Sequence, residues 1–320
     1  MKALNVLFIG GAKRVSFAEY LKRSAEARGY EFNLYSYELE KEVPLAVMAE
    51  IIIGLRWKDS QLIPHLTETI REKQINLVLP FVDPAIAVAR ELKELLPDVF
   101  IPVSNLDICR IMFDKSLAAE WFESLNLPIP RTCHPEKELF FPLIAKPKTG
   151  SASKGIVVIQ DKEAFESFTG KYDLNNYLLQ QYVEKGEEFT VDCYVSKEKE
   201  IISIVPRIRL EQSGGEAVRS KTIHDEKIES LAHQLLQTGA LEGPVTIQFI
   251  RNRQTGETYF MEINPRYGGA VITSFAAGAD TTKTLLEEIS GQKATPITDW
   301  KSNVLMTRYF KEVIFYADNH

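Results

Sequence analysis

Two runs of strand-like residues in the last third of the chain are separated by a short polar turn that contains glycine. The runs are residues 245–251 and 258–263. This pattern predicts a β-hairpin, because such runs joined by a few residues pair as neighbouring antiparallel strands. Side chains two apart share a face of a strand, so Glu262 and Asn264 point the same way. With an odd number of residues in the loop, Gln248 lies opposite Glu262 on that face.

These three side chains would bring together one carboxylate and two amide oxygens. Such a set suits Mg²⁺, which usually takes few protein ligands and completes its coordination with phosphate oxygens and water. Arg266 follows at once, after Pro265, and can direct a planar cation at an anionic group. The stretch Asn-Pro-Arg-Tyr-Gly-Gly, residues 264–269, has the pattern of neither a helix nor a strand. The alternative interpretation is a hairpin whose polar residues simply face solvent.

Composition places the chain among ordinary soluble proteins. Its 320 residues allow about two or three domains. It is 45% hydrophobic and 26% charged with a net charge of −6, and no basic stripe predicts nucleic-acid binding. Cys109, Cys133 and Cys193 are too far apart for a metal site or an obvious disulfide pattern, which predicts reduced thiols in the cytoplasm. The apolar runs are too short to span a membrane, and the first residues do not resemble a signal peptide.

The first hundred residues alternate between strand-like and helix-like runs. This alternation predicts a parallel, doubly wound sheet. The expected strands are residues 5–9, 31–35, 77–79 and 100–101, and the expected helices are residues 14–28 and 84–96.

A glycine pair follows the first expected strand, but it does not have the G-x-G-x-x-G spacing of a dinucleotide site. Gly10 and Gly11 are therefore interpreted as a tight strand-to-helix turn, and NAD is not expected. Ligands of such sheets bind at the carboxyl ends of the strands. Arg14 and Asp83 fall at those ends and are candidate substrate contacts. Asp83 could equally cap the helix that begins at Pro84.

A loop of small residues lies between two strands in the middle of the chain. The strands are residues 142–147 and 156–159, and Lys146 lies near the end of the first. The loop, residues 148–155, can surround phosphate oxygens with backbone N–H groups. It is not a Walker A loop, because the G-x-x-x-x-G-K-[ST] order is missing and a strand follows instead of a helix. The alternative is a flexible hairpin.

Two further segments carry candidate polar contacts. An acidic turn, residues 184–188, follows a strand at residues 177–183 and could be no more than a solvated turn. Arg207 and Arg209 alternate to one face of a strand and lie before Lys221. They could bind a carboxylate or an acyl phosphate, or belong to a mobile surface hairpin.

Taken in order, these segments resemble the ATP-grasp superfamily, and within it the carboxyphosphate-forming units of the carbamoyl phosphate synthetase large subunit. The resemblance is strong over roughly residues 105–290 and loose over the first hundred. It implies an α/β fold of the α+β ATP-grasp type. A Rossmann-like pre-ATP-grasp domain (1–108) would precede two ATP-grasp subdomains that clamp ATP, the first with a glycine-rich flap (109–178) and the second with the metal and catalytic site (179–320).

The resemblance also implies roles for individual residues. ATP would be bound by Lys115, Lys146, Gly150, Ser151, Ser153 and Gly155, by the adenine linker Gln181, Tyr182 and Val183, and by Glu188 at the ribose, with Glu187 as the register alternative. One or two Mg²⁺ ions, or Mn²⁺, would be bound by Gln248, Glu262 and Asn264. Catalysis would involve Arg266, Asn264 and Lys146. Substrate contacts would be Arg14, Asp83, Arg207, Arg209 and Lys221.

The implied activity is that of an ATP- and Mg-dependent ligase. It would activate a carboxylate or bicarbonate as an acyl phosphate for attack by an amine. The alternatives are a biosynthetic ligase for amino acids or peptides, and a non-catalytic ATP-binding regulatory protein. The expected partners are a small-molecule carboxylate and an amine, with no nucleic acid and no membrane. A cytoplasmic location is expected, and a homodimer is left open.

Overall fold

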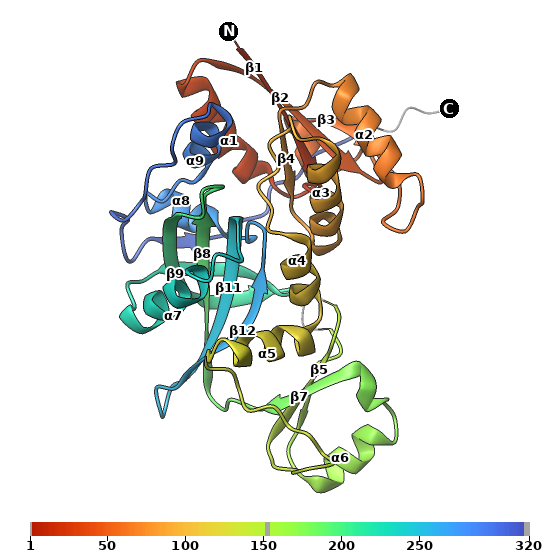
Figure 1. The fold of residues 1–320 in the computed structure, drawn as a ribbon, viewed down its shortest axis with the longest axis vertical. Coiled ribbons are helices and arrows are strands. Elements are labelled where there is room, and N and C mark those ends of the chain that lie inside the picture. The colour runs from red at the N-terminus through yellow and green to blue at the C-terminus, as the bar shows by residue number, and fades with distance from the viewer. Residues whose placement is uncertain (1, 151–153, 317–320) are drawn as a thin grey trace.

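The structure, a computed structural model that describes residues 2–150 and 154–316, contains three β-sheets with helices packed against them (Figure 1). In Figure 1 the four-stranded sheet lies at one end of the long axis, the three-stranded sheet at the other, and the six-stranded sheet between them. The predicted α/β fold class is confirmed.

The four-stranded sheet is parallel and has the strand order β3-β2-β1-β4. Val6 and Phe8 of β1 face one core with α1, whereas Leu7 and Ile9 face the other with α2 and α3. Burial on both faces explains why β1 reads as an apolar run. Its elements are β1 (Lys2–Ile9), α1 (Val15–Ala27), β2 (Tyr30–Glu38), a 3₁₀ turn η1 (Pro44–Val47), β3 (Glu50–Ile53), α2 (Leu62–Glu72), β4 (Leu77–Pro80) and α3 (Asp83–Leu95).

Three features of this sheet differ from the sequence prediction. Strand β3 and helix α2 were not predicted. The strand expected at residues 100–101 is only an isolated bridge between Leu77 and Phe100. The sheet is nevertheless parallel, as predicted.

The six-stranded sheet is antiparallel, with the order β12-β11-β8-β9-β10-β13. One face is covered by α4, α5 and α7 around Phe249 and Phe260. Its strands are β8 (Gly186–Val195), β9 (Ile201–Ser213), β10 (Glu216–Thr222), β11 (Gly243–Asn252), β12 (Thr258–Asn264) and β13 (Leu305–Thr307). The three helices are α4 (Leu106–Phe113), α5 (Lys115–Ser124) and α7 (Glu226–Leu236).

The first two sheets share a hydrophobic core. Phe275 of α8 (Ile272–Ala276) and Leu285 of α9 (Thr282–Ile289) join the cluster that contains Phe8 and Phe17. The loop after β12 is part of the same cluster through Tyr267. This packing holds that loop against the carboxyl ends of the parallel strands, where the site described below is formed.

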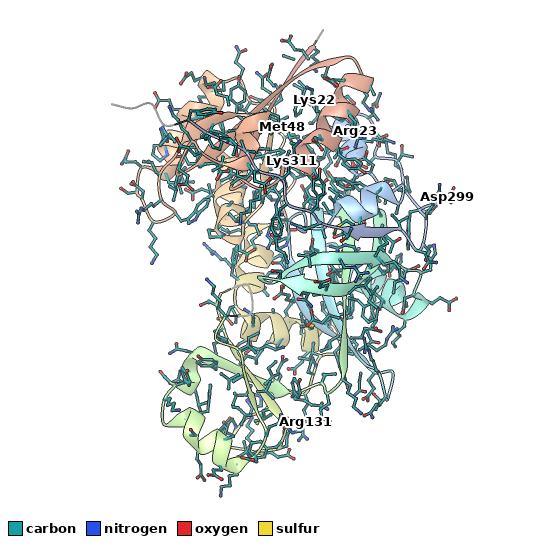
Figure 2. The ribbon with its side chains drawn as sticks, turned by 180° about the vertical axis from the view of Figure 1, so that it is seen from behind. Lys22, Arg23, Met48, Arg131, Asp299 and Lys311 are labelled. Atoms are coloured by element: carbon teal, nitrogen blue, oxygen red, sulfur yellow. The ribbon has the colours of Figure 1, made fainter. Side chains whose placement is uncertain are left out.

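The three-stranded sheet has the order β6-β5-β7 and its own small core around Leu143 and Phe168. Arg131, labelled in Figure 2, lies in this unit with its guanidinium 4.4 Å from the ring centre of Phe140. The elements are β5 (Leu143–Pro147), β6 (Val157–Ile159), α6 (Lys162–Thr169), a 3₁₀ turn η2 (Leu174–Asn176) and β7 (Tyr177–Gln181).

Helices α4 and α5 precede the three-stranded sheet in the chain but pack on the six-stranded one. The domain limits at 108/109 and 178/179 stay a prediction. Among the described residues, none of the helices combines the length and apolar composition that a bilayer crossing requires.

Candidate active site

A cleft of about 1350 Å³ opens between the six-stranded sheet, helices α3 and α4, and the loop after β5. Many of the residues singled out in the sequence line it. They are Arg14, Asp83, Lys115, Gly150, Arg209, Gln248, Glu262, Asn264 and Arg266.

The predicted oxygen cluster is present on β11 and β12. Gln248 pairs with Glu262 across the two strands as expected, but through a bulge after Gln248, since the register next to the turn would have placed Met261 opposite it. Glu262 Oε1 accepts hydrogen bonds from Gln248 Nε2 at 2.7 Å and from Asn264 Nδ2 at 3.0 Å. Within the described part of the chain, no hydrogen bond to Glu262 Oε2 is recorded. One carboxylate with a free oxygen and two amide carbonyls beside it fit a hard divalent cation.

Two arginines donate to the amide oxygens of this cluster. Arg266 donates to Asn264 Oδ1 at 3.2 Å and, through Nε and Nη2, to Asp83 Oδ1 at 2.8 and 2.6 Å. Arg209 Nη1 donates to Gln248 Oε1 at 2.9 Å. The cluster is therefore an unbroken chain of hydrogen bonds. Asp83 is the ion-pair partner of Arg266. It does not cap α3, because the start of α3 has no side-chain cap hydrogen bond.

Lys146 is buried beside this cluster. Its ammonium donates to Gln180 Oε1 at 2.9 Å, and its side chain is only 8% exposed. Burial lowers the pKa of Lys146 to about 8, while the nearby carboxylate of Glu262 works in the opposite direction. The charge of Lys115 also lowers the pKa of Lys146, which indicates that both ammonium groups act on one region. A bound anion would stabilise the charged form of an ammonium that burial has removed from water.

Lys115 and the loop after β5 meet at the rim of the cleft. Lys115 Nζ donates to the carbonyl of Gly150 at 2.8 Å, and the Lys115 backbone N–H donates to Lys148. Gly150 has a φ of 114°, a conformation that favours glycine. Gly155 is also left-handed and lies against Pro147. The predicted contacts Ser151 and Ser153 lie outside the described residues.

The predicted adenine linker begins at the last residue of β7, and its residues are not among those that line the large cleft. The backbone N–H of Gln181 donates to Arg131 and that of Tyr182 donates to Pro142. Among residues 2–150 and 154–316, no acceptor for the Val183 N–H is found. Glu188, the predicted ribose acid, lies 3.2 Å from Arg209 Nη1 and accepts from Gln212 at 2.8 Å. Glu187, the register alternative, pairs with Arg253.

Arg207 does not reach the cleft, and the structure corrects the prediction that it contacts substrate. It is 2% exposed and forms a two-pronged ion pair with Asp192, with Nε–Oδ2 at 2.6 Å and Nη2–Oδ1 at 3.1 Å. Ser220 accepts from Arg207 at 3.0 Å, and Ser274 of α8 donates to Asp192 at 2.6 Å. Arg207 and Arg209 do share a face, but α8 covers the end of that face where Arg207 lies.

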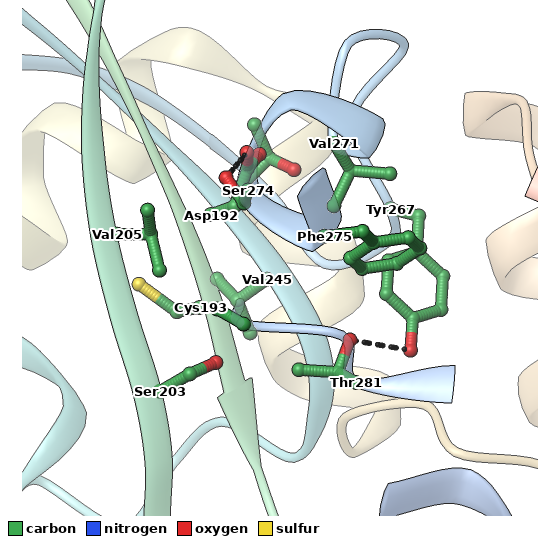
Figure 3. Close-up of a pocket in the computed structure, with 12 residues that line it drawn as sticks. Asp192, Cys193, Ser203, Val205, Val245, Tyr267, Val271, Ser274, Phe275 and Thr281 are labelled. Atoms are coloured by element: carbon green, nitrogen blue, oxygen red, sulfur yellow. Dashed lines mark hydrogen bonds between the residues drawn. The ribbon is translucent and has the colours of Figure 1, made fainter. Parts of the chain in front are cut away.

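Figure 3 shows the cavity beneath α8, with the Ser274–Asp192 bond and the Tyr267–Thr281 bond at its edges. Its volume is about 10 Å³, too small for more than about one water molecule. This cavity is a packing feature. Lys221 of β10 is likewise not among the residues that line the large cleft.

At one edge of the cleft, Arg14 belongs to a cluster whose other members, Glu216 and Arg308, were not predicted from the sequence. Glu216 lies 3.3 Å from Arg14 Nη2 and 2.9 Å from Arg308 Nη1. Gly269 makes this approach feasible, because a Cβ there would lie 3.1 Å from Arg14 and 3.2 Å from Glu216. The Gly-Gly pair after Arg266 was the available signal, but nothing in the sequence connects Arg308 with residues 14 and 216.

A family model described as "ATP-grasp in the biosynthetic pathway with Ter operon" matches residues 173–311. The carbamoyl phosphate synthase large chain of Methanobrevibacter smithii is 24% identical over 73% of this chain and 24% of its own length. The D-alanine–D-alanine ligase of Fusobacterium nucleatum is 26% identical over 49% of this chain and 58% of its own length. This chain thus spans about a quarter of the first relative and little more than half of the second.

Among solved structures, the biotin carboxylase domain of Hydrogenobacter thermophilus 2-oxoglutarate carboxylase, in complex with MgADP, ADP and bicarbonate, superposes with a TM-score of 0.76. The match covers 94% of this chain and 73% of that one at 18% identity, which shows a common fold. In its fold, and over residues 173–311 in its sequence, the chain is therefore similar to ATP-grasp proteins.

Proposed function

We propose that this protein is an ATP- and Mg²⁺-dependent ligase that activates a carboxylate or bicarbonate as an acyl phosphate for attack by an amine. The observation that carries the proposal is the convergence of the Gln248–Glu262–Asn264 oxygens with the guanidinium groups of Arg209 and Arg266 at one cleft, with Lys146 buried close enough for Glu262 to act on its pKa. An oxygen cluster bordered by fixed positive charge suits a polyphosphate with its metal.

The reaction needs positioning and charge neutralisation more than a nucleophilic side chain. A carboxylate oxygen attacks the γ-phosphorus, and the bond from that phosphorus to ADP breaks. The amine nitrogen then attacks the acyl carbon, phosphate leaves, and the nitrogen loses a proton. Lys115 and Lys146 would neutralise phosphate oxygens, and Arg266 would orient the acid beside Asn264. Glu262, Gln248 and Asn264 would hold one or two Mg²⁺ ions, which supply Lewis-acid charge to the phosphates.

A second candidate concerns the acid. The cleft extends from the oxygen cluster along α3 and α4 to Trp57, Arg110 and Phe113. A lining with aromatic and cationic groups suits a larger acid or amine than bicarbonate and ammonia. This extension favours an amino-acid or peptide ligase. The partial match to a D-alanine–D-alanine ligase is compatible with that reading.

The screen that tests the function measures ADP release from Mg-ATP with bicarbonate, pooled amino acids and hydroxy acids, each with and without pooled amines. A ligase releases ADP only when its acid is present, and the acid identifies the substrate class. Nucleotide binding without ADP release in any pool would instead favour a non-catalytic ATP-binding protein. Use of Mn²⁺, the homodimer, the small-molecule partners and the cytoplasmic location stay predictions.

The pH dependence of nucleotide affinity tests the role of Lys146. Phosphate binding requires the ammonium form, which the empty site loses as the pH rises through about 8. We therefore expect the affinity for Mg-ATP to be constant below that pH and to fall by up to about tenfold per pH unit above it. The variant Lys146→Arg should bind without this decline, since its guanidinium stays protonated. Calorimetric titrations from pH 7 to 9.5 measure both profiles, and identical slopes for the two proteins would contradict the assignment.

A further inference from the structure

Arg209 is a buried cation in the cleft wall whose side chain is only 8% exposed. Its Nη1 atom lies 2.9 Å from Gln248 Oε1 and 3.2 Å from Glu188 Oε2, and its Nη2 atom donates to the carbonyl of Gly215 at 2.9 Å. Its Nε atom is buried, and no partner for it is recorded among the described residues. Arg209 is thus held mainly by one amide oxygen and one carboxylate.

Both of those partners have other roles in the proposed function. Gln248 Oε1 is the oxygen of that side chain that can bind a metal ion, because the other end of the amide already donates to Glu262. Glu188 is the acid predicted to bind the ribose hydroxyls. A bound Mg-nucleotide would therefore withdraw from Arg209 the two acceptors at its Nη1 atom.

A buried guanidinium without an anion is strongly unfavourable, so Arg209 must then find another partner. The nucleotide supplies one in its phosphates, which accept charge-assisted hydrogen bonds from arginine. Arg209 lines the same cleft as Gln248 and Glu262. Its backbone is fixed, because β9 lies between β8 and β10 in the sheet.

We propose that Arg209 exchanges partners: in the empty site it occupies the metal-binding oxygen of Gln248 and pairs with Glu188, and in the loaded site it binds the γ-phosphate of ATP. This inference rests on the proposed function. It assigns to one residue two opposite effects, competition with the metal in the empty site and attraction of the phosphate in the loaded one.

The variant Arg209→Met separates these effects. Mn²⁺ alone, titrated by electron paramagnetic resonance, should bind several-fold to about tenfold more tightly to the variant, because a competing cation is gone. The Mg complex of a non-hydrolysable ATP analogue should bind about 10- to 100-fold more weakly in calorimetry, from loss of a charge-assisted hydrogen bond. ADP should bind at most a few-fold more weakly, because it lacks the γ-phosphate.

Arg219→Met is the matched control, because Arg219 is half exposed on β10 and its carboxylate partner is 3.9 Å away. It should change neither titration. Arg209→Lys, which keeps the charge, should recover most of the affinity for the ATP analogue. If the methionine variant does not fold, Arg209→Gln, which also removes the charge, is used for both titrations.

If Arg209 had only a structural role, Arg209→Met would weaken the binding of both Mn²⁺ and the ATP analogue, or would change neither. Either result overturns the proposal. Equal losses of affinity for ADP and the ATP analogue would also overturn it. A wild-type protein that binds no nucleotide at all would refute the proposed function itself. The two failures are therefore distinguishable.

Discussion

Replacing Glu262 with alanine is expected to abolish acid-dependent ADP release while leaving the fold intact. Glu262 is the one carboxylate of the oxygen cluster, and both neighbouring amides donate to it. Loss of the metal position removes several kcal/mol of transition-state stabilisation, or about a thousandfold or more in rate. Steady-state assays with the acid that the screen identifies measure this effect, and thermal melting verifies the fold.

Two variants sharpen this prediction. Glu262→Gln keeps the size and the acceptor oxygen but removes the charge, so it should be nearly as inactive as the alanine variant. Gln248→Ala should lose only on the order of tenfold, because water can replace a neutral amide oxygen as a ligand. An active Glu262→Gln protein would show that the metal assignment is wrong.

Replacing Asp192 with alanine is expected to destabilise the protein by about 3–5 kcal/mol. The change leaves the guanidinium of Arg207 without its carboxylate at a position that is 2% exposed, and an uncompensated buried charge costs about that much. The hydroxyl of Ser274 also loses its acceptor. Urea denaturation of variant and wild type measures the difference in free energy of unfolding.

Two controls separate the ion pair from nonspecific damage. Glu211→Ala removes an exposed partner that lies 3.9 Å from Arg219, and it should change stability by no more than about 1 kcal/mol. The double variant Asp192→Ala with Arg207→Met should recover part of the loss, since no charge is then left buried. An Asp192→Ala cost below about 1 kcal/mol would contradict a tightly coupled pair.

The oxygen cluster was predictable because its geometry is local. Residues two apart on one strand share a face, and a short hairpin predicts that the two strands pair. The exact partner of Gln248 was not fixed by the turn, because the bulge after Gln248 shifts the register from Met261 to Glu262. The parallel sheet was predictable for a similar reason, since β1 is buried on both faces and reads as an apolar run. The short strand β3 and the helix α2 carry weaker patterns and were missed.

The errors and omissions concern contacts between distant segments. Alternation along β9 correctly places Arg207 and Arg209 on one face, but only the packing of α8 determines which of them is covered. Asp83 and Arg266 were both singled out, yet their ion pair joins residues 183 positions apart. Arg308 was missed because its position beside Glu216 depends on the pairing of β13 with β10.

The central claim is that the cleft binds Mg-ATP through the Glu262 cluster, and calorimetric titration with a non-hydrolysable ATP analogue tests it most directly. We expect one nucleotide per wild-type chain, an affinity that rises with Mg²⁺, and loss of that Mg²⁺ dependence in Glu262→Gln. Bound nucleotide should also raise the melting temperature by mass action. No heat and no shift in melting temperature at tenfold excess of the Mg-nucleotide would contradict the account.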